Sequence, residues 1–141
     1  MIAYFDTSAL VPLLVSEPGT ERAVTLWDAA GHVVSSRLSY PEGRAALAQA
    51  HRLDRLTNRG LRDAVDALDA CFEEIDLVEV DDGLARRAGQ IAEVRALRGY
   101  DAVHLASALL IQDADLVMVS GDLALLAAAR AEGMSTAALV P

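Results

Sequence analysis

Short apolar runs alternate along the chain with longer segments of helical periodicity. Apolar runs bounded by polar or turn residues predict strands at Ile2–Phe5, His32–Ser35, Ile75–Val80, Leu116–Ser120 and Ser135–Val140. Apolar positions three and four residues apart predict helices at Ser8–Val15, Thr20–Ala30, from the second strand to about His51, from a Thr57 cap to about Glu73, from Asp81 to about Leu97, and at Asp101–Ile111 and Asp122–Glu132. This alternation predicts right-handed crossovers, and so an α/β fold with a mainly parallel sheet of about five strands between helical layers.

Acidic residues follow the ends of the predicted strands. In parallel α/β folds, ligands gather beyond the carboxyl ends of the strands. Asp6 directly follows the first strand, and Asp122 follows the fourth after a single glycine. Glu42 lies near the start of the helix after the second strand, and Asp101 begins the apolar helix DAVHLASALL. The predicted topology would therefore bring these acids to one edge of the sheet.

Each of these acids also has a purely structural explanation. Aspartate is a favoured N-cap, worth about 1 kcal/mol through its bonds to the free amides of the first turn. Asp6, Asp101 and Asp122 could each serve only in this way. Ser39 and Glu42 have the spacing of a capping box, while the proline between them leaves the start of that helix open.

Four ionised carboxylates in one place are costly. At separations of about 5 Å and an effective dielectric of about 20, each pair repels by roughly 3 kcal/mol, and all pairs together reach about 20 kcal/mol. This exceeds the ~5–15 kcal/mol stability of a whole domain, and helix dipoles offset only part of it. Such a cluster persists if a divalent cation occupies it or if some acids are protonated. All-oxygen ligands with open positions suit Mg²⁺ or Mn²⁺.

The composition narrows the class of protein. The chain has 141 residues, of which 53% are hydrophobic, and this predicts one folded domain over residues 1–141. A single cysteine, Cys71, excludes an internal disulfide framework and a cysteine-rich metal site. The N-terminus lacks the features of a secretory signal, and no run approaches the ~20 apolar residues of a membrane span. We therefore expect a cytoplasmic location without membrane contact.

The charge limits how the protein could handle nucleic acid. The formal net charge is −9, and all 12 basic residues are arginine. Nonspecific coating of nucleic acid needs a basic surface, so this chain would need a local device such as clustered arginines, a metal ion or a basic partner. A bound Mg²⁺ would meet this need, because it can bind a phosphate oxygen and activate water for phosphodiester hydrolysis.

Four segments, DTSALVPLLVSEPG, SYPEGRAAL, DAVHLASALL and ADLVMVSGDLALL, resemble the PIN-domain ribonucleases. More narrowly, they resemble the VapC-type toxins of bacterial and archaeal toxin–antitoxin pairs, and the resemblance runs nearly from end to end. It implies a three-layer α/β/α fold with a central parallel sheet and an acidic site of Asp6, Glu42, Asp101 and Asp122. It also implies that Asp6 and Asp101 bind Mg²⁺ or Mn²⁺ directly, and that the other two acids complete the site directly or through water.

The same resemblance implies a function. Members of this family cut single-stranded or looped RNA, and several act on transfer or ribosomal RNA. Growth arrest follows unless a cognate antitoxin binds the toxin, and homodimers are common. We therefore expect a metal-dependent endoribonuclease that acts as the toxin of a toxin–antitoxin pair.

Several residues near these acids could support them. Thr7 or Ser8 could hydrogen-bond Asp6 or a metal-bound water, and Ser120 could orient the site in a similar way. His104 lies one turn after the acid of the apolar helix and is expected to pack against the sheet rather than to contact substrate.

Other charged residues are expected to lie outside the site. The arginines could position phosphates, but each is expected to be a solvated charge on a helix surface; they are Arg37, Arg86, Arg87 and Arg98. Asp115 precedes a predicted strand and is expected at the opposite edge of the sheet.

Two other classes of function remain open at this point. A phosphotransfer receiver or an aspartyl phosphatase also places an aspartate after the first strand, but both usually need a lysine, which this chain lacks. The phosphatase also needs a second aspartate where Ser8 stands. A noncatalytic PIN-like module could instead use the acidic pocket to bind a basic partner segment.

Overall fold

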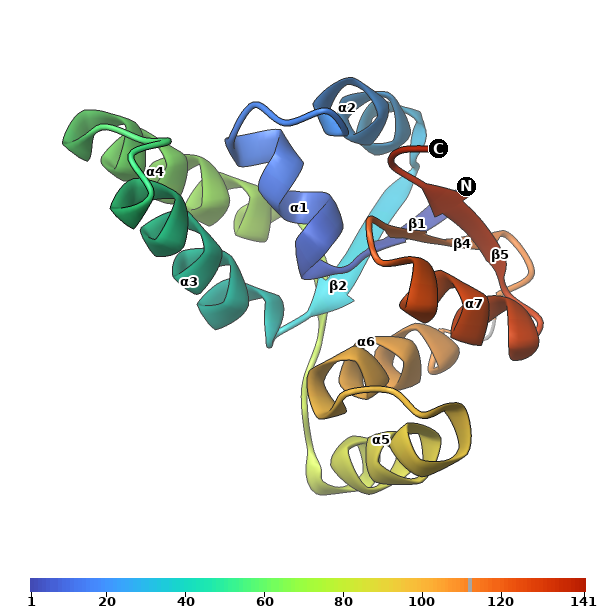
Figure 1. Ribbon diagram of the computed structural model, residues 1–141. Helices are drawn as coiled ribbons and strands as arrows, with labels where there is room; N and C mark the ends of the chain where they lie inside the picture. Colours follow the sequence, from blue (N-terminus) through green and yellow to red (C-terminus); the bar gives the residue numbers. More distant parts are fainter. Residues whose placement is uncertain (112) are drawn as a thin grey trace.

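A computed structural model of the chain describes residues 1–111 and 113–141 and has a five-stranded parallel sheet at its centre (Figure 1). The strands run in the order β3-β2-β1-β4-β5, and every neighbouring pair is parallel. Their bounds are β1 (Ile2–Phe5), β2 (His32–Ser36), β3 (Asp76–Val78), β4 (Leu116–Ser120) and β5 (Ser135–Ala138). The predicted parallel sheet is confirmed, and it places β1 in the middle with β4 beside it.

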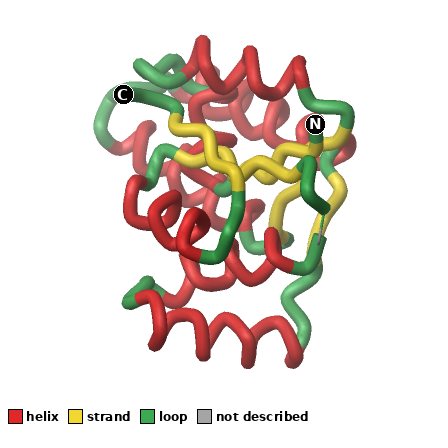
Figure 2. The backbone as a smooth tube through the Cα atoms, turned by 90° about the vertical axis from the view of Figure 1, so that its right-hand side faces the viewer, coloured by secondary structure: helices red, strands yellow, loops and turns green. Residues whose placement is uncertain are grey.

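Helices cover both faces of this sheet and complete three layers, α/β/α (Figures 1 and 2). On one side lie α1 (Thr7–Leu14), α2 (Thr20–Ala29), α3 (Ser39–Arg52) and α4 (Asn58–Glu74). On the other side lie α5 (Asp82–Arg95), α6 (Gly99–Leu109) and α7 (Leu123–Ala131). In the described part of the chain, none of these helices has the length and apolar character that crossing a membrane requires.

Successive side chains of the central strands point to opposite faces of the sheet and pack into two separate hydrophobic cores. Phe5 and Val119 pack with α1 and α2 on one face, whereas Tyr4 and Met118 pack with α5, α6 and α7 on the other. All four side chains are fully buried. This alternation follows from the two-residue period of a strand, and it fixes the register of β1 and β4 because a slip of one residue would exchange the two faces.

The edge strands are shorter than the sequence predicts. β3 covers Asp76–Val78 of the expected Ile75–Val80, and β5 ends at Ala138 rather than Val140. Each of these strands pairs with a neighbour on one side, β3 with β2 and β5 with β4. Apolar pattern predicts where a strand can form, but the ladder ends where the partner strand stops offering hydrogen bonds.

One predicted helix start is wrong, and one possible capping box is absent. The apolar helix begins at Gly99 with Arg98 as its N-cap residue, so Asp101 is the third helical residue and not a cap. The capping box of Ser39 and Glu42 does not form either, because the Ser39 hydroxyl shares a hydrogen bond of 2.7 Å with that of Ser35. Helix capping therefore does not explain why Asp101 and Glu42 are acidic residues.

The start of α3 accommodates Pro41 in its first turn. Ser39 is the first helical residue, and Pro41 is the third. Amides of the first turn have no partner within the helix, so a proline there removes no helical hydrogen bond. Tyr40 donates a backbone hydrogen bond to Arg37 at 3.2 Å, and Glu42 donates one to the carbonyl oxygen of Leu38, four residues back, at 3.2 Å. Glu42 is thus firmly placed on a helix, next to the end of β2.

Helices α3 and α4 form an antiparallel pair that holds Glu42 in position. A β-carbon added at Gly43 would lie 3.3 Å from both methyl carbons of Leu68, which shows how closely the two helices approach. Leu68 is fully buried, and it belongs to a small core with Val15 and Leu47. A side chain at Gly43 would therefore require Leu68 to shift.

Replacing Leu68 tests this contact. We expect Leu68→Ala to lower the free energy of unfolding by about 2–5 kcal/mol, because it removes buried methyl groups and leaves a cavity. Urea denaturation followed by circular dichroism measures the change. The matched control Leu53→Ala alters a side chain that is 63% exposed and should change the stability by less than about 0.5 kcal/mol. Equal losses for both variants would contradict the proposed packing.

Candidate active site

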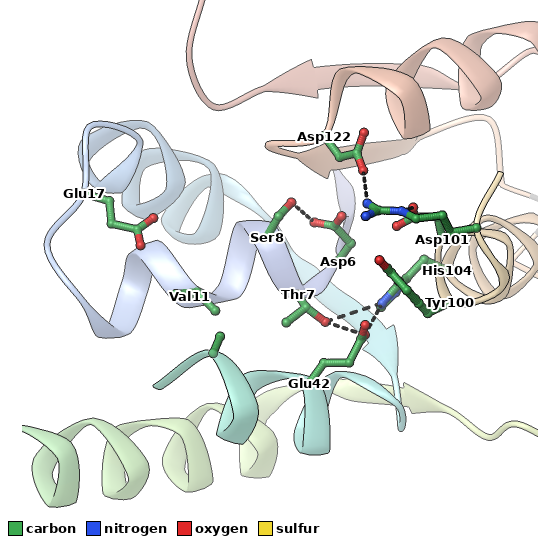
Figure 3. Close-up of a pocket in the computed structure, with 12 residues that line it drawn as sticks. Asp6, Thr7, Ser8, Val11, Glu17, Glu42, Tyr100, Asp101, His104 and Asp122 are labelled. Atoms are coloured by element: carbon green, nitrogen blue, oxygen red, sulfur yellow. Dashed lines mark hydrogen bonds and ion pairs between the residues drawn. The ribbon is translucent and has the colours of Figure 1, made fainter. Parts of the chain in front are cut away.

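A pocket of about 360 Å³ lies at the carboxyl edge of the sheet, where β1 and β4 end side by side. All four predicted acids line it: Asp6, Glu42, Asp101 and Asp122. They come from the β1–α1 junction, from α3, from α6 and from the β4–α7 junction, and Figure 3 shows them directed toward a common space. The structure therefore brings these four residues together, while their role as metal ligands stays a prediction.

Asp6 is both a helix cap and a wall of the pocket. Its side chain is almost completely buried at 3% exposure. Oδ1 accepts hydrogen bonds from the Ser8 hydroxyl at 2.7 Å and from the Ala9 amide at 3.1 Å, and Oδ2 accepts one from the Ser120 hydroxyl at 2.8 Å. Burial raises the pKa of Asp6 above its ordinary value, although these hydrogen bonds and nearby His104 act in the opposite direction.

Two serine hydroxyls tie the ends of β1 and β4 together around this carboxylate. The Ser8 and Ser120 hydroxyl oxygens lie 3.1 Å apart, and each hydroxyl donates to Asp6. Each also accepts from a backbone amide of the β4–α7 junction, Ser8 from Gly121 at 2.8 Å and Ser120 from Asp122 at 2.9 Å. The expected contacts of Ser8 and Ser120 with the site are present, and they orient Asp6 relative to Asp122.

Glu42 is held by a second set of partners. Its Oε1 accepts from the Thr7 hydroxyl at 2.7 Å and lies 2.8 Å from Nε2 of His104. Burial would raise the pKa of Glu42, but the hydrogen bonds from His104 and Thr7 outweigh it and lower the pKa. Thr7 thus supports Glu42 rather than Asp6, which corrects one alternative drawn from the sequence.

His104 connects this carboxylate to the core. It is 2% exposed, and its Nδ1 lies 2.9 Å from the Tyr4 hydroxyl. An ionised Glu42 can only accept, so Nε2 of His104 carries the hydrogen of this bond. The expectation that His104 packs in the protein interior is met, but it also lines the pocket.

The remaining two acids share a cation supplied by the chain. Nε of Arg98 donates to Oδ2 of Asp101 at 3.0 Å, and Nη2 donates to Oδ2 of Asp122 at 3.4 Å. Asp122 also caps α7, since its Oδ1 accepts from the amides of Ala124 and Leu125. Burial raises the pKa of Asp101 in spite of the hydrogen bond from Arg98, and the charge of Asp122 adds to the increase.

Sequence reasoning missed the contacts of one arginine and two polar lining residues. Arg98 is exposed as expected, but it also lines the pocket and pairs with two acids. Tyr100 and Glu17 also line the pocket and were not singled out. Arg37 and Arg86 are exposed as expected; Arg37 pairs with Glu79, and Arg86 pairs with Asp82. Asp115 lies at the opposite edge of the sheet as expected, where it pairs with the N-terminal amine.

The side chains as they stand do not form a closed metal site. Across residues 1–111 and 113–141, no group of three or more histidine, cysteine, aspartate or glutamate side chains is arranged to hold a metal ion. The donor set nevertheless fits a hard divalent cation, because four carboxylates line one pocket and two of them already share a positive charge. A metal ion shared by Asp101 and Asp122 would require the Arg98 guanidinium to move.

Comparison with known proteins identifies the family of this chain. Residues 3–131 match the family described as PIN domain. The chain is 44% identical over 136 residues to "Ribonuclease VapC49" of Mycobacterium tuberculosis strain H37Rv, a match that covers 96% of this chain and 94% of the relative.

Solved structures share the fold at low sequence identity. The crystal structure of Mycobacterium tuberculosis VapC20, described as a sarcin-ricin loop cleaving toxin, has a TM-score of 0.70 at 20% identity and covers 89% of this chain and 94% of its own. VapBC2 from Rickettsia felis, solved bound to a DNA fragment from its promoter, has a TM-score of 0.66 at 10% identity and covers 98% of each chain.

The buried carboxyl of Asp6 predicts how stability depends on pH. A carboxyl whose pKa is higher in the folded than in the unfolded state favours folding most when it is protonated, and this contribution is lost as the pH rises through the folded pKa. We therefore expect Asp6→Asn, which mimics the protonated form, to stabilise the protein in EDTA at pH 7 by about 1 kcal/mol.

Thermal unfolding between pH 8 and pH 5 measures this effect. The advantage of Asp6→Asn over the natural chain should shrink as the pH falls through the raised folded-state pKa of Asp6, because Asp6 then becomes protonated. The control Asp66→Asn makes the same change of charge on the exposed side of α4 and should show no such pH-dependent gain. A lower stability of Asp6→Asn at pH 7 would show that the ionised carboxylate favours folding.

Proposed function

The chain belongs to the PIN-domain family, and from this we propose that it is a VapC-type endoribonuclease that depends on a divalent metal ion. The proposal rests on one observation above all: four carboxylates from four separate segments line a single pocket at the carboxyl edge of the sheet. The identity of 44% to a ribonuclease, over nearly the whole length of both chains, supports the same activity. The substrate would be the phosphodiester backbone of RNA.

Asp6 and Asp101 would hold Mg²⁺ or Mn²⁺ directly, and Glu42 and Asp122 would complete the site directly or through water. When bound, such a cation supplies charge stabilisation at a phosphodiester and makes an attacking water easier to ionise. The cation would also reduce the repulsion between this chain, whose formal charge is −9, and the negatively charged RNA.

The protein's own part is to hold the carboxylates in place. The hydroxyls of Ser8 and Ser120 fix both oxygens of Asp6, and His104 with Thr7 fixes one oxygen of Glu42. Hydrogen bonds to the ionised form favour that form. These residues prepare the negative site before a cation or substrate arrives, so little side-chain order has to be gained on binding.

We also propose that the protein acts in the cytoplasm as a toxin and is restrained by a cognate antitoxin. The support is the identity with a protein named VapC, together with the acidic pocket itself. A basic partner segment could place an arginine against these carboxylates, because bidentate pairs between arginine and carboxylate are strong. The alternative function, a noncatalytic module that only binds such a segment, uses the same pocket without chemistry.

Cleavage assays with purified protein test the nuclease activity. We expect Asp6→Asn and Asp101→Asn each to lower the rate of Mn²⁺-dependent RNA cleavage at least about a hundredfold, which corresponds to about 2.7 kcal/mol of lost transition-state stabilisation. Asp115→Asn is the matched control, because Asp115 is 70% exposed at the opposite edge of the sheet, and it should cleave like the natural chain. EDTA should abolish cleavage.

Two outcomes would contradict the proposal. Unchanged cleavage in both Asp6→Asn and Asp101→Asn, with normal circular dichroism spectra, would overturn the site assignment. An absence of cleavage of total cellular RNA by the natural chain with Mn²⁺ or Mg²⁺ would favour the noncatalytic module.

Controlled expression in a bacterial host tests the toxin role. The natural chain should slow growth when expressed without a partner, and Asp101→Asn should restore growth at equal protein level, since the toxicity requires the chemistry of the site. Sequencing of RNA ends after brief induction would identify the cleaved RNA. Normal growth with abundant folded natural protein would count against the toxin role and leave the nuclease activity to be decided by the cleavage assay.

A further inference from the structure

One arginine of the chain lies inside the acidic pocket without a structural need at its own position. Arg98 is the N-cap residue of α6 and makes no side-chain cap bond. A cation at a helix N-terminus opposes the helix dipole, so this position gains nothing from a positive charge. The side chain is 66% exposed and is therefore not required to fill the core.

The contacts of Arg98 are instead made with the two acids on opposite sides of the pocket. Its guanidinium donates to Asp101 of its own helix at 3.0 Å and to Asp122 of the β4–α7 junction at 3.4 Å. These are the only two of the four acids that receive no hydrogen bond from a hydroxyl or an imidazole among the described residues. Arg98 therefore supplies a positive charge to the two acids whose carboxylates no other side chain contacts through a hydrogen bond among the described residues.

We propose that Arg98 is a built-in counter-ion of the pocket, which balances Asp101 and Asp122 in the metal-free protein and competes with the divalent cation for them. The proposal rests on the metal site proposed above and adds a regulating residue to it. Both acids direct their Oδ2 oxygens to Arg98. A cation held by these oxygens would have to displace the guanidinium.

The rest of the geometry allows this exchange. The Cζ atom of Arg98 lies 4.8 Å from the centroid of the Tyr100 ring, which also lines the pocket. An exposed arginine on a long side chain can leave its carboxylates at low cost, because exposed ion pairs are individually weak. The guanidinium thus lowers the repulsion between the acids without closing the pocket permanently. The apparent affinity for metal is the intrinsic affinity multiplied by the fraction of molecules in which the guanidinium has left the acids.

Metal binding by Arg98 variants tests the proposal without relying on catalysis. The amount of free Mn²⁺ in titrations of the purified protein, measured by electron paramagnetic resonance, gives the dissociation constant. We expect Arg98→Gln to bind Mn²⁺ about three- to tenfold more tightly than the natural chain, because no side chain then competes for the acids. The rise in melting temperature on adding Mn²⁺ should also be larger in Arg98→Gln.

Two controls separate local competition from a change of total charge. Arg86→Gln removes one positive charge from an exposed pair with Asp82 on α5, outside the pocket lining, and should bind Mn²⁺ like the natural chain. Arg98→Lys keeps a positive charge at the site, and its affinity should lie closer to that of the natural chain than to that of Arg98→Gln.

The outcomes distinguish this proposal from the proposed function. Equal Mn²⁺ affinity in the natural chain, Arg98→Gln and Arg86→Gln, with intact RNA cleavage, would overturn the counter-ion role and leave the nuclease activity standing. Tighter binding in Arg86→Gln by the same factor as in Arg98→Gln would also overturn it, since net charge would then explain the effect. A lack of Mn²⁺ binding in every variant, without cleavage, would overturn both proposals.

Discussion

Carboxylates that are gathered in one pocket repel one another, and each needs a partner that keeps it there. In this chain the partners differ from acid to acid. Asp6 is held by two hydroxyls and a backbone amide, and Glu42 by a hydroxyl and an imidazole. Asp101 and Asp122 share the guanidinium of Arg98. The cost of the cluster is therefore divided among local contacts, and the pocket can exist before any metal ion binds.

The topology of the sheet explains why these partners are available at the same place. Because β1 and β4 are parallel neighbours, the residues that follow them start two helices at one edge. Asp6 and Asp122 cap these helices with one oxygen each and have another oxygen for other contacts. Capping and participation in the site are thus not alternatives: the cap fixes the side chain, and the second oxygen remains available to the pocket.

The sequence predicted the sheet and the meeting of the acids because both follow from local pattern. An acid after Ile2–Phe5 and another after Leu116–Ser120 must lie close together once the two strands are parallel neighbours. The position of Arg98 could not be predicted in this way, because it depends on the approach of α6 to the β4–α7 junction. Placing the start of α6 at Asp101 also left out Tyr100, which lies in the first turn of the helix.

The ends of the edge strands and the position of one loop residue also could not be predicted from the local sequence. Val80 and Val140 have the apolar character of strand residues, but they lie beyond the last pairs of β3 and β5. Glu17 follows α1 in a loop and reaches the pocket through the turn of the chain, and no local spacing connects it with Asp6 or Glu42. Local sequence thus determines which elements form, whereas these contacts depend on how elements distant in the chain approach one another.

The unequal partners of the four acids also indicate which part of the pocket would change when a cation binds. Asp6 and Glu42 are bound by donors that lie in or near the core: Ser120 is fully buried and His104 is 2% exposed. Such donors are held by packing and have little freedom to move. Arg98 is mostly exposed and is attached at a helix end. If only this side chain moved, a metal ion would replace the guanidinium of Arg98 at the pocket. The sheet edge and the carboxylates of Asp6 and Glu42 would keep their positions.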